Sequence, residues 1–224
     1  PTFERIYESF NGIYRKTAIL NNRIYVAGDS YTVANQNGEY FIALLDTNSK
    51  EIWRETYAIT HNDYGTRPLV TDFKVDNTNN CFFIYLVVFH LNDQNSIIYQ
   101  DSYIIKFDEF GIQEWKYITH SYIFPVYETP GDQICIENNN ISFFHSTENK
   151  TTKEFYVTSI STDGDSLSTF NVKVDTIDKL IPEKMIFVDN SYYMSCLYNN
   201  NDNNPQPCII RVNEDKEIEW IRKN

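Results

Sequence analysis

The sequence predicts an all-β chain, specifically a β-propeller built from four-stranded antiparallel blades. Three observations predict this fold: a phrase that repeats along the 224 residues, apolar and polar residues that alternate around each turn, and the lack of any useful stretch with a 3.6-residue period. Aromatic residues make up 16% of the chain, with 17 Tyr and 15 Phe against 2 Met, which favours pleated, half-buried surfaces over helices.

An aromatic residue marks the last strand, strand D, of each repeat. Seven residues before each of the last four aromatics stands an Asx residue: Asp46, Asp108, Asp163 or Asn213. An Asx residue followed by polar residues and then an alternating run predicts a hairpin turn. We interpret the aromatics as packing between neighbouring blades. They stand at intervals of 50, 62, 55 and 50 residues, at Phe3, Trp53, Trp115, Phe170 and Trp220.

A second landmark, an Asn-rich tight turn between two short apolar strands, precedes each of these hairpins. It occurs in "AILNNRIYVAG", "FKVDNTNNCFFIYLVV", "ICIENNNISFFH" and "MIFVDNSYYMSC". Asn suits such turns because it tolerates positive φ. Each unit thus runs strand A, tight turn, strand B, loop, strand C, Asx turn, strand D. The expected units of this single domain are 10–57, 64–119, 128–173 and 181–222, with 1–9 as an extra outer strand.

Two arrangements of these units stay open. Either four blades close a ring and the extra strand adds to an edge, or the chain is part of a larger propeller, whose unsealed edges invite pairing with another chain. A β-sandwich or two small barrels would not predict aromatic landmarks at such even intervals.

Charge and hydropathy exclude some function classes. The formal charge of −12 repels a phosphate backbone, so we expect no general nucleic-acid binding. The longest apolar run, "CFFIYLVVF", has the length of a strand and is far short of the ~20 residues of a membrane span.

The four cysteines follow no metal-binding spacing, so we expect neither a metal site nor a cofactor. If "SYYMSCLY" and "PQPCIIRV" pair as a hairpin, Cys196 and Cys208 lie nearly opposite each other. They are therefore a candidate disulfide, and buried thiols are the alternative.

The stretches "RIYVAGDS" and "NGEYFIALLDTNSKEIWRETY" resemble repeats of secreted bacterial β-propeller proteins, and "DSYIIKFDEFGIQEWKYI" matches their second half. That family is similar in style to pyrroloquinoline-quinone-type propeller repeats. The resemblance implies an extracytoplasmic protein (secreted, at the cell surface or periplasmic) that acts as an adhesion, surface or scaffold module. This chain has only 7 Gly and lacks a run of quinone ligands, so the resemblance implies no catalytic residue and no cofactor.

The loops that connect strand D to strand A, and strand B to strand C, share one face of a propeller, where binding sites gather on a rigid scaffold. Candidate binding residues in or beside the D-to-A loops are His61, Tyr64, Arg67, His120, Tyr122, Phe124 and Tyr127. Exposed aromatics in the second of these loops would form an interaction patch. The alternatives are solvated histidines and aromatics that pack beneath the loop.

No Walker loop, G-x-S-x-G or H-E-x-x-H motif occurs in the chain. The first functional hypothesis is therefore a non-enzymatic scaffold, or a subunit of a larger assembly, whose partner is another protein. The alternative is a propeller that binds or cleaves carbohydrate, with a glycan as its partner. Cleavage needs two carboxylates roughly 5–10 Å apart, and the candidate acids are Asp72, Asp132 and Glu183.

Overall fold

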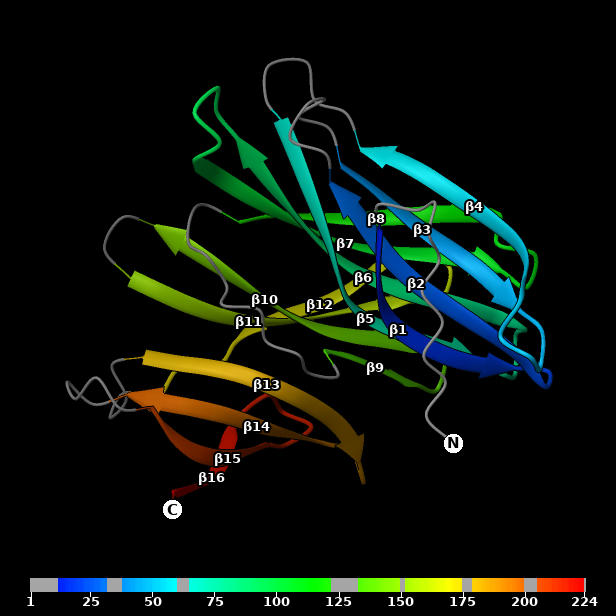
Figure 1. Ribbon diagram of the computed structural model, residues 1–224. Coiled ribbons are helices and arrows are strands. Elements are labelled where there is room, and N and C mark those ends of the chain that lie inside the picture. The colour runs from blue at the N-terminus through cyan, green and yellow to red at the C-terminus, as the bar shows by residue number, and fades with distance from the viewer. Residues whose placement is uncertain are drawn as a thin grey trace. The chain divides into compact units, whose positions relative to one another are not determined.

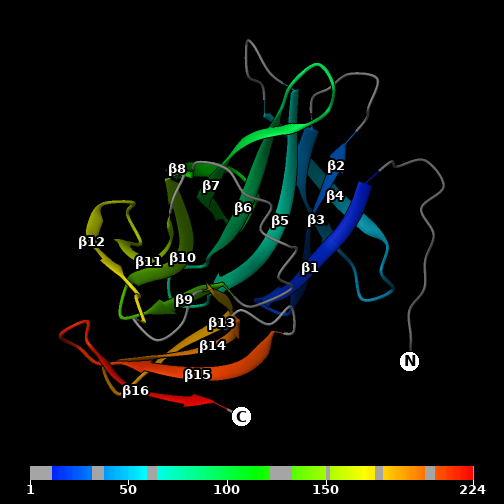
Figure 2. The ribbon, with the colours of Figure 1, turned by 90° about the vertical axis from the view of Figure 1, so that its left-hand side faces the viewer.

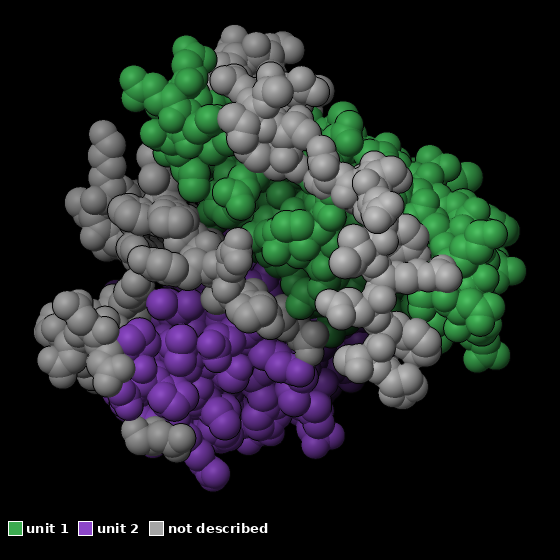
Figure 3. All heavy atoms as spheres, in the orientation of Figure 1, with its two compact units in different colours: residues 1–123 green, residues 124–224 purple. Residues whose placement is uncertain are grey.

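The computed structural model shows an all-β chain of four four-stranded antiparallel sheets, the blade arrangement of a β-propeller, as the sequence predicts (Figure 1). It describes residues 12–31, 38–59, 65–121, 133–149, 152–174, 179–199 and 205–223. No helix in these ranges is long and apolar enough to cross a membrane. The chain divides into two compact units, 1–123 and 124–224, coloured separately in Figure 3, and each is described by itself.

Unit 1 holds the first two blades, and in both the strands follow one another in chain order. Blade 1 consists of β1 (Gly12–Leu20), β2 (Arg23–Tyr31), β3 (Gly38–Leu45) and β4 (Glu51–Ile59). Blade 2 consists of β5 (Gly65–Asp76), β6 (Cys81–Leu91), β7 (Ile97–Asp108) and β8 (Gln113–Ser121). The apolar core between the two blades includes fully buried Tyr25, Ile42, Phe82, Ile84 and Phe107.

Unit 2 holds the last two blades. Blade 3 consists of β9 (Ile134–Glu137), β10 (Asn140–Asn149), β11 (Thr152–Ser161) and β12 (Ser166–Asn171). Blade 4 consists of β13 (Lys179–Val188), β14 (Ser191–Asn199), β15 (Gln206–Val212) and β16 (Ile218–Lys223), which lie side by side in both ribbon views (Figures 1 and 2). The core between blades 3 and 4 is built around Val157, Met194 and Ile210.

The tight turns between strands A and B use Asn as predicted. Asn21 and Asn22 of blade 1 have φ of 50° and 60°, and Asn138 and Asn139 of blade 3 have nearly the same values, 50° and 62°. Because Asn accepts left-handed backbone more readily than most residues do, these turns are inexpensive to form.

The turns between strands C and D share one capped geometry. In blade 1, a carboxylate oxygen of Asp46 accepts the N–H groups of Asn48 and Lys50 at 2.9 and 2.8 Å. Asp108 and Asn213 begin the turns of blades 2 and 4. In each of the four turns the residue three positions after the capping residue has positive φ: Ser49, Gly111, Gly164 and Lys216.

Blade 3 departs from the predicted register. Ser161, rather than Asp163, begins its turn, and its hydroxyl accepts the N–H groups of Asp163 and Asp165 at 3.2 and 3.1 Å. A serine hydroxyl caps a turn as an Asx side chain does, so the landmark moves by two residues. Counting seven residues on, Ser168 rather than Phe170 occupies the position that Trp53 occupies in blade 1.

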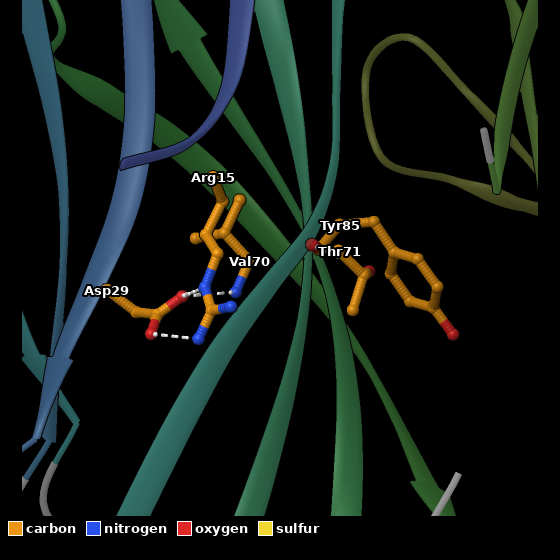
Figure 4. Close-up of polar contacts among 5 residues, drawn as sticks. All are labelled: Arg15, Asp29, Val70, Thr71 and Tyr85. Carbon is orange, nitrogen blue, oxygen red and sulfur yellow. Dashed lines mark hydrogen bonds and ion pairs between the residues drawn. The ribbon is translucent and has the colours of Figure 1, made fainter. Parts of the chain in front are cut away.

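Inner strands β1, β5 and β13 each contain a β-bulge, at Arg15, Thr71 and Glu183. In unit 1 the bulges of β1 and β5 both lie beside the buried side chain of Asp29 (Figure 4). The Asp29 carboxylate accepts from Arg15 Nε and Nη2 at 2.9 and 3.2 Å, and from the Val70 N–H at 3.1 Å. One carboxylate therefore ties β1 and β2 to β5, which joins the two blades.

Candidate functional site

Most of the predicted loop-face residues lie outside the described residues: His61, Tyr64, Tyr122, Phe124 and Tyr127. Arg67 is exposed on β5, opposite Phe89 of β6. His120 lies on β8, opposite Asp101 of β7. The loop-face site therefore stays a prediction.

Asp72 and Glu183, the candidate catalytic acids among the described residues, belong to different units. Asp72 of unit 1 is 1% exposed, and its Oδ1 accepts the Phe73 N–H at 2.7 Å and lies 3.9 Å from Lys74 Nζ. Glu183 belongs to unit 2, at the bulge of β13, and Asp132 lies outside the described residues. Within the described ranges, no group of three or more His, Cys, Asp or Glu side chains is placed to hold a metal.

The pairing of β14 with β15 puts Cys196 directly opposite Cys208, as the hairpin requires. Both side chains are free thiols in this structure, so the disulfide itself stays a prediction. A hydrogen bond with Cys208, together with burial, raises the pKa of the Cys196 thiol.

The strand D aromatic of blade 1 packs onto the turn between strands C and D of the following blade. Trp53 lies so close to Gly111 that a Cβ added there would come within 2.4 Å of the ring. Beside it, the Tyr25 hydroxyl donates to the Glu109 carbonyl at 2.8 Å. Tyr25 and Trp53 make an edge contact with centroids 6.2 Å apart, and together they fasten blade 1 to blade 2.

The step from blade 3 to blade 4 lacks this aromatic pair. Ser142 is the third residue of β10, as Tyr25 is of β2, and Ser168 replaces Trp53. Phe170, two residues further along β12, still packs against Tyr192 of blade 4, with ring centroids 5.6 Å apart. Lys216 stands where blade 2 has Gly111, and its ammonium lies 5.0 Å from the Tyr192 ring centroid. A hollow of about 280 Å³ opens at this place, lined by Ser142, Ser168, Tyr192 and Lys216 among others.

The last blade carries the aromatic pair again, on the face directed away from the core of unit 2. Tyr193 is the third residue of β14, and its ring centroid lies 6.2 Å from that of Trp220 at an interplanar angle of 64°. The corresponding values for Tyr25 and Trp53 are 6.2 Å and 66°. Blade 4 therefore presents the same fastening pair that blade 1 uses.

The surface around this pair is apolar and open. We call it the terminal face, and it consists of Ile186 and Val188 of β13, Tyr193 of β14, Ile209 and Arg211 of β15, and Trp220 of β16. Ile186, Val188 and Ile209 are 47%, 44% and 45% exposed. The Tyr193 hydroxyl makes no hydrogen bond with the described residues, whereas that of Tyr25 is bonded to the next blade.

Cations lie on and beside the terminal face. Arg211 pairs with Glu219 at 2.7 Å and lies over the Tyr193 ring, 5.5 Å from its centroid. The guanidinium of Arg222 lies 5.0 Å from the centroid of Trp220. The strand D landmark in the sequence marked Trp220, but only the strand pairing shows which face it shares with Tyr193.

No protein-family model matches the chain, and no curated protein matches it. The polysaccharide lyase Uly1 has a solved structure 14% identical over 93% of this chain and 47% of its own, with a TM-score of 0.49. A mutant of Synechocystis apocarotenoid oxygenase is 10% identical over 90% and 46%, with a TM-score of 0.45. An ACO/RPE65 chimera is 11% identical over 90% and 46%, with a TM-score of 0.43.

The chain thus spans about half the length of these solved structures. Matches this distant carry no argument about what the chain binds.

Proposed function

We propose that the chain is a non-enzymatic, extracytoplasmic interaction module whose terminal face docks a blade of a partner protein. The observation that carries the proposal is the half-buried Tyr193–Trp220 pair of the terminal face, which has the geometry of the Tyr25–Trp53 pair. Because the earlier pair fastens one blade to the next, the later pair is suited to receive another blade. Aromatic anchors of this kind dominate the binding energy of protein interfaces.

The contacts between blades 1 and 2 suggest what the partner surface would be. The partner would present a turn between strands C and D with a Gly under Trp220, as Gly111 lies under Trp53. A carbonyl of that turn would accept the Tyr193 hydroxyl, as the Glu109 carbonyl accepts Tyr25. Acidic residues in that turn would complement Arg211 and Arg222.

A second copy of this chain is a poor occupant for the terminal face. The faces of blades 2 and 4 that would receive it are already buried in the cores of their own units, where Phe82 and Met194 are 0% exposed. A second copy would have to uncover one of these faces first. We propose a blade other than the four described as the occupant, and a dimer of this chain would contradict the proposal.

The test is capture from an envelope extract of the source cells, with the tagged chain as bait. The double variant Tyr193→Ala, Trp220→Ala removes the fastening pair from a surface that is not the core of its unit, so the fold should persist. Phe110→Ala is the matched control, because Phe110 is a 61% exposed aromatic of unit 1. We expect a partner with blade-type repeats to be captured by wild type and control and lost with the double variant.

Capture that survives the double variant, or no capture by wild type, would overturn the proposal. Far-UV circular dichroism of each variant establishes that the loss is not caused by unfolding.

A further inference from the structure

We propose that the hollow in unit 2 binds one pyranose ring of a carbohydrate. It lies where the repeat has a missing aromatic pair: Ser142 and Ser168 stand in the positions that Tyr25 and Trp53 occupy in blade 1. Its volume of about 280 Å³ is just below the ~300–1,000 Å³ of pockets for drug-sized ligands, so it suits a single ring.

The lining combines aromatic rings with hydroxyls and amides. Phe187 and Tyr192 line the hollow, with ring centroids 4.7 Å apart. The hydroxyls of Ser142, Ser159 and Tyr192 form a triangle with sides of 2.8, 3.0 and 3.1 Å. Within the triangle each hydroxyl can donate its one proton to a neighbour and accept one hydrogen bond. Each oxygen then keeps one lone pair that can accept from a ligand.

Other polar groups complete the lining. The Lys216 ammonium can donate, and so can the amides of Asn138 and Asn190, all of which line the hollow. Glu137 also lines the hollow, and its carboxylate can accept a hydrogen bond.

A pyranose ring matches both halves of this lining. Its hydroxyls both donate and accept, whereas its C–H faces are apolar and can lie against Phe187 or Tyr192. An aromatic hydrocarbon would offer no hydrogen bond to the serines, the amides or Lys216, and would displace water without replacing its hydrogen bonds. The chemistry of the lining therefore points to a sugar ring. This inference does not depend on the terminal face, which is a different surface of blade 4.

The test is saturation-transfer difference NMR with the full chain and three probes: glucose, galactose and glucuronic acid. We expect saturation of the ring protons of at least one probe. The variant Ser168→Trp, Lys216→Gly rebuilds the Trp53–Gly111 arrangement inside the hollow, so it should abolish the signal by filling the space. Lys216→Met is a smaller change that should weaken binding about tenfold, the share of one charged hydrogen bond.

Tyr193→Ala, Trp220→Ala should leave the signal unchanged, so the failure of the docking proposal and the failure of this one are distinguishable. No saturation of any probe by the wild type, or the same saturation after the hollow is filled, would overturn the inference. If Ser168→Trp, Lys216→Gly does not fold, an undiminished saturation signal with Lys216→Met would overturn the inference instead.

Discussion

The variant Gly111→Ala tests the blade-to-blade step most sharply in unit 1. The new Cβ would stand 2.4 Å from Trp53 Cη2, at a residue whose φ is +83°. Overpacking of this kind costs about 1–3 kcal/mol, and a non-Gly residue in left-handed backbone costs about 1–2 kcal/mol. We therefore expect Gly111→Ala to lower the free energy of unfolding of unit 1 by about 2–5 kcal/mol.

A second background separates the two costs. With Trp53→Ala the ring is gone, so only the backbone cost of about 1–2 kcal/mol should remain for Gly111→Ala. Urea unfolding is followed by the fluorescence of Trp115 on β8, with Trp220→Phe in every protein so that unit 2 contributes no tryptophan. Equal costs of Gly111→Ala with and without the Trp53 ring would refute the packing described here.

Three further outcomes follow from the described contacts. Asp29→Ala should lower the free energy of unfolding in urea by about 2–3 kcal/mol, because the Arg15 guanidinium and the Val70 N–H lose their acceptor. The half-buried turn cap Asp46 is the control, and a smaller loss for Asp29→Ala than for Asp46→Ala would contradict the account. Burial lowers the pKa of His145 from 6.5 to about 4, so between these values the unfolded state binds more protons than the folded state. The free energy of unfolding should therefore fall as the pH falls, by about 2 kcal/mol from pH 7 to pH 5. His145→Phe should remove this share of the loss, and an unchanged dependence of stability on pH would count against it. Burial raises the pKa of Cys81 from 9.0 to about 11, so at pH 8 its thiol should react with a disulfide reagent about a hundredfold more slowly than a free cysteine; rapid labelling in a variant whose other cysteines are Ser would show that the thiol is not buried.

Much of the fold could be predicted from the sequence, because its signals are local. Turn capping by Asp46 and Asp108 depends on a side chain and the backbone two to four residues on, and positive φ at Asn21 depends on that residue's own side chain. The regular recurrence of these turns was enough to predict the all-β class and the four-stranded blades.

The register of blade 3 was wrong for an equally local reason. Asp163 and Phe170 keep the seven-residue spacing of the other copies, but the cap at Ser161 is a hydroxyl, which an Asx landmark misses. The same two-residue shift kept the hollow from being predicted, because the Asx landmark points to Phe170 rather than to Ser168 as the residue in the tryptophan position.

The candidate sites depend on which strands stack, and this is not visible in one sequence. Tyr193 is three residues after a turn, as Tyr25 is, and that shared position was a usable signal. Its partner across the sheet, Trp220, lies on the same face only because of the β14–β15–β16 register. The loop face was favoured instead because exposed aromatics in long loops are the usual indication of a binding surface.

The most direct test of the account is a photo-cross-linking map of the terminal face. Benzoylphenylalanine at Ile209, which is 45% exposed on this face, is activated in source cells, and cross-linked peptides are identified by mass spectrometry. The same residue at Ile112, 62% exposed in unit 1, is the control position. The account predicts that position 209 alone joins an acidic, Gly-containing turn of a partner blade. Identical products at both positions, or cross-links from position 209 only to other copies of this chain, would contradict it.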